Sequence, residues 1–226
     1  WPVRQLGRVL ADLGKATVSL GRLDEILSVP EEKEPGRAEK PEIRGRVQFK
    51  DVCFGYDTYD DVLHEISFTA EPGQTIAILG STGSGKTSLV QLLQRLYLCT
   101  AGAIYIDGTN INDIEHGHLR RNIGIVLQEP FLYSRTIMDN IRLVRPEAAE
   151  EEVHAAARVA AVHDVIESFE QGYDTVVGER GVTLSGGQKQ RGGIARMLMQ
   201  NAPILIFDDS MSAVDTETDA AIRAAL

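Results

Sequence analysis

One short glycine-rich segment constrains this chain more than any other feature. It follows the apolar run 75–79, which we expect to be a short buried strand, and it precedes a helical pattern over 89–94. Glycines allow backbone N–H groups to approach phosphate oxygens, and the start of the helix adds the positive end of its dipole. In such a loop Lys86 reaches the β- and γ-phosphates and the Thr87 hydroxyl binds Mg²⁺. This phosphate loop (80–88) reads Gly80-Ser81-Thr82-Gly83-Ser84-Gly85-Lys86-Thr87-Ser88.

A second segment supplies the carboxylates that such a loop requires. The apolar run 204–207 is followed directly by Asp208 and Asp209. Ligands of parallel sheets bind where the strands end, so both side chains are expected near the phosphates. Asp208 is expected in the Mg²⁺ shell, and Asp209 stands where a catalytic base or a water-orienting group would be. Two aspartates after a strand also suit a solvated turn, but the phosphate loop favours the magnesium interpretation.

The remaining pattern indicates an α/β architecture. Strand-like runs occur near residues 47–54, 66–68, 104–106 and 123–127, whereas 136–171 is helical and rich in Ala and Glu. Strands that alternate with helices predict a layered α/β fold, and the helix-rich insert suggests a sub-domain.

Composition limits the functional classes. The chain has 226 residues with 43% apolar and 25% charged side chains, which is typical of a folded globular protein. Its net charge of −10 argues against a broad nucleic-acid-binding face. Cys53 and Cys99 form no CxxC pair, which suggests reduced thiols in a cytosolic setting. An uninterrupted apolar run long enough to span a bilayer is not visible.

The first 28 residues differ from the rest. Leucine recurs every seventh position at Leu6, Leu13, Leu20 and Leu27, which predicts an amphipathic helix. Glycines recur with the same period and lower helix propensity by about 1 kcal/mol each. This is either a surface helix on its own domain or a helix whose partner lies outside this chain, and we favour the second. The proline-rich, charged segment 29–45 is then a linker.

A third motif brings a family resemblance. The run Leu184-Ser185-Gly186-Gly187-Gln188 resembles the LSGGQ signature of ABC-type ATPases. Together with the phosphate loop and Asp208, it makes residues 46–226 similar to the nucleotide-binding domain of an exporter with a fused membrane domain. The resemblance implies a P-loop NTPase of RecA-like core, with an antiparallel β sub-domain and an inserted α-helical sub-domain at about 130–195. Residues 1–28 then correspond to the cytoplasmic end of the last transmembrane helix.

The resemblance also implies roles for individual residues. Tyr56 is similar to the aromatic residue that stacks on adenine, although a core tyrosine is the alternative. Gln128 is similar to the glutamine that senses Mg²⁺ and faces the membrane domain. In this family a signature caps the γ-phosphate that the phosphate loop of a second domain holds. The implied catalytic residues are Lys86, Gln128 and Asp209. The implied metal ligands are Thr87, Gln128 and Asp208. The implied nucleotide contacts are Tyr56, residues 80–88, Gln128, Ser185, Gly186, Gly187 and Gln188.

The implied function is Mg²⁺-dependent ATP hydrolysis that drives export, at the cytoplasmic face of the cell membrane in the full protein. The implied partners are a second ABC ATPase domain and the coupling helices of the membrane domain, without nucleic acid, and the fragment itself is expected to be soluble. One alternative is a soluble ABC ATPase acting on ribosomes or DNA, which the net charge and the leading helix oppose. The other is a regulatory ATP-binding module without transport.

Three departures from the family pattern matter. Asp209 stands where the family usually has glutamate, which suggests a degenerate catalytic site. A chain with such a site is expected to pair with a paralogous half-transporter rather than with a second copy of itself. Val176 stands where exporters commonly carry a glutamate that contacts the opposite subunit's coupling helices. The chain ends at Leu226, before the family's switch histidine. We therefore expect a domain that is incomplete at its C-terminus, poorly stable and nearly inactive by itself.

Overall fold

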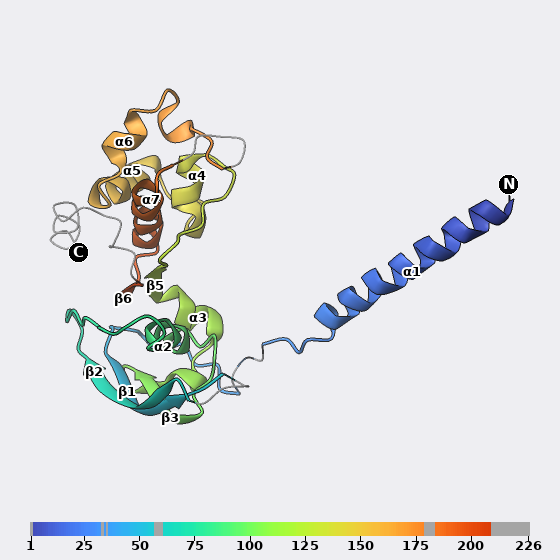
Figure 1. The fold of residues 1–226 in the computed structure, drawn as a ribbon. Coiled ribbons are helices and arrows are strands. Elements are labelled where there is room, and N and C mark those ends of the chain that lie inside the picture. Colours follow the sequence, from blue (N-terminus) through green and yellow to red (C-terminus); the bar gives the residue numbers. More distant parts are fainter. Residues whose placement is uncertain (1, 33, 35, 57–60, 179–183, 209–226) are drawn as a thin grey trace. The chain divides into compact units, whose positions relative to one another are not determined.

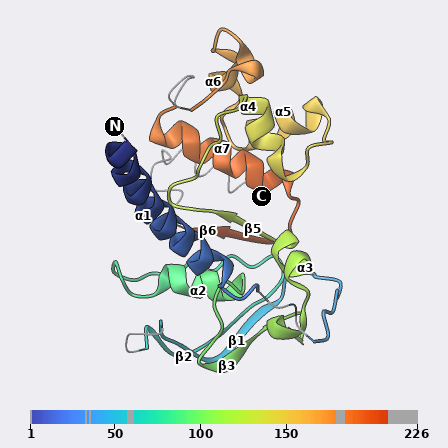
Figure 2. The same ribbon diagram turned by 90° about the vertical axis from the view of Figure 1, so that its right-hand side faces the viewer.

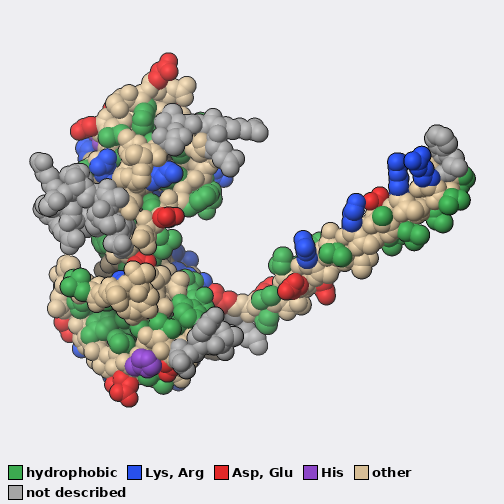
Figure 3. All heavy atoms as spheres, in the orientation of Figure 1, with side chains coloured by type: hydrophobic (Ala, Val, Ile, Leu, Met, Phe, Trp, Pro, Cys, Tyr) green, Lys and Arg blue, Asp and Glu red, His purple; other side chains and the backbone are tan. Residues whose placement is uncertain are grey.

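The computed structural model describes residues 2–32, 34, 36–56, 61–178 and 184–208, and these form two units, 1–34 and 35–226. The first unit is dominated by helix α1 (Pro2–Leu27), which starts at a proline, the residue favoured in a first helical turn. Its side chains are all exposed, and Lys and Arg gather along one side of it (Figure 3). Among the described residues, no helix is both long and apolar enough to cross a membrane.

The second unit begins with an antiparallel sheet (Figure 1). Its strands are β1 (Val47–Phe54), β2 (Leu63–Ala70), β3 (Ala101–Ile106) and β4 (Thr109–Asn110), in the order β2-β1-β3-β4. Helices α2 (Lys86–Leu93) and α3 (His116–Arg121) and the 3₁₀ turn η1 (Ile111–Asp113) share one apolar core with this sheet. In that core the rings of Phe49 and Phe68 stack across β1 and β2, with centroids 4.6 Å apart.

A bulge in this sheet depends on one glycine. The pairing of β1 with β3 shifts between Lys50 and Cys53, and Asp51 there adopts a φ of +48°. Opposite the bulge, Gly102 has a φ of +75°, and a Cβ on it would lie 2.2 Å from the Asp51 carbonyl oxygen. A side chain at this position would therefore have to displace backbone, which is costly.

Gly102→Ala is expected to lower the free energy of unfolding by about 3 kcal/mol, because left-handed strain adds to the backbone clash. The matched control is Gly73→Ala, since Gly73 has a similar φ of +77° but nothing within 4 Å of the added Cβ. The control is expected to cost about 1 kcal/mol, the price of left-handed strain alone. Urea denaturation measures both, and equal losses would contradict the role of the bulge.

A second, parallel sheet contains β5 (Ile123–Val126) and β6 (Ile204–Phe207), which pair in register from Ile123–Ile204 to Val126–Phe207. It lies between the antiparallel part and the helical part of the unit (Figure 2). The prediction of a buried strand at 75–79 is wrong. The segment is not a β-strand in the structure, and Leu79 is 92% exposed. The physical reason is that, within the described residues, no strand is paired with it, so no sheet holds or buries it.

The helical part confirms the inserted sub-domain. It comprises α4 (Ile137–Ile141), η2 (Arg142–Val144), α5 (Glu150–Val159), α6 (His163–Glu167), η3 (Gly172–Asp174) and α7 (Gly186–Met199). Apart from η2, these elements share a second apolar core, to which β5 contributes Val126. The α/β fold with a P-loop NTPase core, an antiparallel sheet and a helical insert is therefore as the sequence predicts.

The later part of the expected linker at 29–45 belongs to the second unit and is hydrogen-bonded to the rest of it. The Glu39 N–H donates to the Asp113 carbonyl oxygen at 2.8 Å. Further along, the Asp107 carboxylate accepts from the backbone N–H groups of Arg44, Gly45 and Arg46, at 2.7, 3.1 and 3.2 Å. The chain is thus fixed to the unit immediately before β1 begins.

Candidate nucleotide-binding site

The phosphate loop leads into α2 and depends on glycine at two positions. Gly85 precedes α2 with a φ of +86°, and a Cβ there would lie 2.7 Å from Cδ2 of Leu63. At the other end of the loop, a Cβ on Gly80 would lie 2.4 Å from the Ser84 Oγ atom. The loop therefore folds tightly on itself and leaves backbone rather than side chains at these positions, as a phosphate cradle requires.

Lys86 is the first residue of α2 and its side chain returns over the loop. Its Nζ atom donates to the carbonyl oxygens of Gly80 and Ser81, both at 2.9 Å. The ammonium group is thus held at the loop that a phosphate would enter, next to the start of a helix. Both features favour an anion at this place.

The structure brings two of the three predicted metal ligands together. The Thr87 Oγ1 atom donates to the Asp208 Oδ2 atom at 3.3 Å, although these residues are far apart in sequence. Asp208 follows β6, and its N–H donates to the Val126 carbonyl oxygen at the end of β5 at 3.0 Å. A hydroxyl and a carboxylate are hard oxygen donors, so this pair fits Mg²⁺.

Gln128, the third predicted ligand, lies just beyond the end of β5. Because β5 and β6 are parallel neighbours, Gln128 and Asp208 leave the sheet at the same edge. The Gln128 carbonyl oxygen accepts from Nε2 of Gln190 on α7 at 3.0 Å. The Gln128 backbone is thus tied to the helix that follows the signature, and its predicted contact with metal stays a prediction.

Tyr56 rests against α2 beside the phosphate loop. Its hydroxyl is 2.9 Å from the Ser88 Oγ atom and donates to Oε1 of Gln91 at 3.2 Å. Its ring meets Phe54 and Tyr97 edge-on, at centroid distances of 4.8 and 5.2 Å. The residue is half-buried and packs against the core of the sheet, so stacking on adenine stays a prediction.

The signature forms the start of α7. Ser185 is the N-cap: its Oγ accepts from the Gln188 N–H at 3.3 Å, and Oε1 of Gln188 accepts from the Ser185 N–H at 2.8 Å. Ser185 and Gly186 are exposed, and within the described part of the chain no hydrogen bond joins Ser185 to the phosphate loop. The exposed helix start is therefore accessible to a second molecule.

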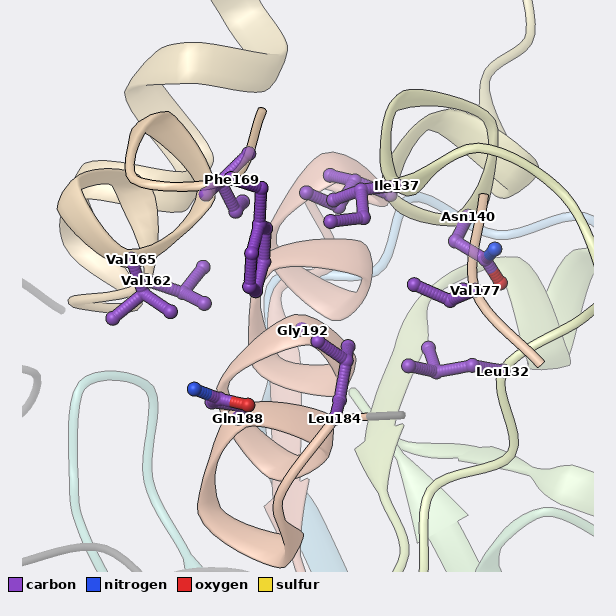
Figure 4. Close-up of a pocket in the computed structure, with 12 residues that line it drawn as sticks. Leu132, Ile137, Asn140, Val162, Val165, Phe169, Val177, Leu184, Gln188 and Gly192 are labelled. Carbon is purple, nitrogen blue, oxygen red and sulfur yellow. The ribbon is translucent and has the colours of Figure 1, made fainter. Parts of the chain in front are cut away.

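A small cavity lies behind the signature (Figure 4). Its volume is about 20 Å³, which is room for about one water molecule. Apolar side chains of α4, of α6 and of the adjoining loops, Leu184 among them, surround it, and α7 contributes Gln188 and Gly192. We interpret it as a packing gap rather than a ligand site.

Asp209, the predicted water-orienting residue, lies outside the described residues. Val176 is described and 44% exposed, and it forms an antiparallel bridge with Thr136. Sequence reasoning missed Gln190, which binds the Gln128 backbone. The available signal was periodicity, because Gln190, Ile194 and Met197 are spaced along one buried face of α7, and a buried polar side chain requires a partner.

The site and fold define a nucleotide-binding domain, and comparison with known proteins gives its family. The profile of the ABC transporter family matches residues 63–212, so the chain belongs to the ABC transporter family. It is 44% identical to the beta-(1→2)glucan export ATP-binding/permease protein of Rhizobium johnstonii, covering 98% of this chain and 42% of that protein. It is 45% identical to the alpha-hemolysin translocation ATP-binding protein of Escherichia coli O157:H7, covering 96% of this chain and 31% of that protein.

A solved structure agrees with this assignment. A bacterial Atm1-family ABC exporter with ATP bound matches 97% of this chain and 39% of its own, with a TM-score of 0.86 and 40% identity. The chain thus spans less than half the length of these relatives.

Proposed function

We propose that this chain is the nucleotide-binding domain of an exporter, in which Mg²⁺-dependent hydrolysis of ATP drives transport. The contact between Thr87 and Asp208 carries the proposal, because it unites the phosphate loop with the acidic strand end. The names of the relatives, which are export and translocation proteins, support the export direction.

Each group has a proposed task. Lys86 and the loop N–H groups bind and orient the β- and γ-phosphates. Thr87, Asp208 and Gln128 hold Mg²⁺, which when bound neutralises developing charge on the phosphates. Asp209 orients the attacking water, and Tyr56 supports the adenine ring.

The site is proposed to be complete only in a pair of domains. Ser185, Gly186 and Gly187 stand at an exposed helix start, where N–H groups and the dipole favour an anion. In the pair, these groups cap the γ-phosphate held by the partner's phosphate loop. ATP therefore bridges the two domains, and hydrolysis removes the bridging charge.

The second domain is proposed to be a paralogue, because Asp209 is one methylene shorter than glutamate. This chain would then bind ATP well, hydrolyse it poorly and supply an intact signature to a competent partner site. The coupling helices of the membrane domain are proposed to contact the face that carries Phe131, Tyr133 and Val176, which are 68%, 46% and 44% exposed. The domain is accordingly proposed to lie at the cytoplasmic face of the membrane.

Trans complementation in the full-length protein tests the shared site. Two differently tagged copies are used, one with Lys86→Ala and one with Ser185→Asp, because aspartate keeps the N-cap but adds charge facing the γ-phosphate. The readout is Mg–ATP retained after rapid gel filtration, which does not require hydrolysis. Each variant alone is expected to retain almost none, whereas the mixed pair keeps one intact site and regains about half of the unmodified level.

Two outcomes would contradict this proposal. If copies that all carry Ser185→Asp co-purify with one another and still retain ATP normally, then the chain binds nucleotide without a partner, as a regulatory module would. If the mixed pair regains nothing although both copies co-purify, then the phosphate loop and the signature do not share a site.

A further inference from the structure

Beyond Gln190, the segment after Gln128 packs closely against α7 at one more point. A Cβ on Gly193 would lie 2.8 Å from Cβ of Pro130, so the ring of Pro130 packs against the backbone of α7 at this glycine. The hydrogen bond from Gln190 to Gln128 lies one turn earlier on α7. The loop therefore follows α7 from Gln190 towards its C-terminal end.

Arg196 makes the next contact along the same helix. Its Nη1 atom donates to the Phe131 carbonyl oxygen at 2.8 Å, and its Nε atom donates to the Asn140 carbonyl oxygen at 2.7 Å. Its Nη2 atom donates to the Asn140 Oδ1 atom at 3.0 Å, and the guanidinium lies 5.9 Å from the centre of the Tyr133 ring. One planar group thus binds three oxygens of the loop and of α4.

Asn140 completes the connection from inside α4. Its side chain is buried, with 2% of the residue exposed. Its amide nitrogen donates to the carbonyl oxygens of Tyr133 and Thr136, at 2.9 and 3.0 Å, and its Oδ1 atom accepts from the Tyr133 N–H at 2.8 Å. Asn140 therefore sets the turn of the loop and presents it to Arg196.

We propose that Arg196 and Asn140 are positioning residues that join the segment 128–140 and α7 into one rigid body, so that a displacement at Gln128 moves Ser185 with it. The proposal rests on the proposed function, because only a shared nucleotide site makes the movement of Ser185 matter. It assigns coupling to residues that touch neither nucleotide nor metal.

The chemistry of arginine explains why this residue stands here. Burial lowers the pKa of the Arg196 guanidinium, but the group stays charged and its hydrogen bonds are charge-assisted. Lysine offers a single point charge and cannot place three donors in one plane. Arg196→Lys is therefore not a conservative change at this position.

Distance measurements between spin labels test the rigid body in the full-length protein, with its native cysteines replaced. One pair of labels at Glu129 and Lys189, both exposed, lies within the proposed body, and a second pair at His64 and Lys189 reports its movement against β2. In the unmodified protein we expect the first distance to stay narrow and constant when Mg–ATP is added, while the second shifts.

Arg196→Met is expected to broaden the first distance distribution. It is also expected to lower kcat by ten- to a hundredfold while the KM for ATP stays within about twofold, because Ser185 is misplaced and the phosphate loop is intact. Arg196→Lys is expected to lower kcat by a smaller factor, again with little change in the KM for ATP. It replaces the methionine variant in the test if that variant does not fold. Arg142→Met is the matched control, because Arg142 is also half-buried but pairs locally with Asp139 at 2.8 Å.

An unchanged first distance in both Arg196 variants would overturn the proposal, whether or not turnover falls. If the Arg196 variants lose thermal stability but kcat does not fall relative to KM, then Arg196 has only a structural role. That result would also overturn the proposal. The failure of the proposed function is distinct: the unmodified protein would then show neither hydrolysis nor a shift of the second distance, while the first distance still reports the rigid body.

Discussion

Lys86→Ala is expected to lower the retention of ATP by at least a hundredfold and to abolish measurable hydrolysis. The ammonium group provides the positive charge at the mouth of the phosphate loop, where it is fixed by two carbonyl oxygens. Losing one such preorganised donor costs about a hundred- to a thousandfold in kcat. Retention of radiolabelled ATP by the full-length protein measures the first effect, and phosphate release measures the second.

The fold should survive this change. Alanine is the strongest helix former, so α2 can still begin at position 86. Lys189→Ala is the matched control, since Lys189 is an exposed lysine near the start of a helix but outside the phosphate loop. Normal ATP retention by Lys86→Ala would contradict the proposed function. An equal loss of ATP retention in Lys189→Ala would indicate a general charge effect.

Asp209→Glu is expected to raise the turnover of a pair made of two copies of this chain by about a hundredfold. The added methylene moves the carboxylate forward by about an ångström, and misplacement on this scale costs of order a hundredfold in rate. Steady-state ATP hydrolysis with saturating Mg²⁺ measures the gain.

Asp208→Glu is the matched control for that gain, because it makes the same chemical change one position earlier. There the carboxylate already meets Thr87 at 3.3 Å, so lengthening it should lower turnover. Robust turnover by the unmodified pair would contradict the degenerate-site proposal and favour a homodimer.

Local chemistry made much of this molecule predictable. The glycines at 80 and 85, the capping of α7 by Ser185 and the alternation of strands with helices follow from conformational preference and periodicity. These rules also predict that Asp208 lies near the loop, because parallel strands end at a common edge.

Other features depend on contacts that no local pattern encodes. The apolar run 75–79 has the composition of a buried strand, but a strand also needs a neighbour to pair with, and its described surroundings supply none. Asn140 and Arg196 are ordinary helix residues in sequence. Their importance arises only when a loop and two helices meet, so it could not be inferred from spacing.

The carboxylate of Asp107 has a mechanical consequence. It binds three successive backbone N–H groups at 44–46, immediately before β1 starts. Hydrogen bonds to a charged acceptor are each worth about 1.5–3 kcal/mol, so a pull on the preceding chain that has broken the contact at Glu39 meets this stronger anchor next. Because Asp107 directly follows β3, tension is then carried into the pairing of β1 with β3.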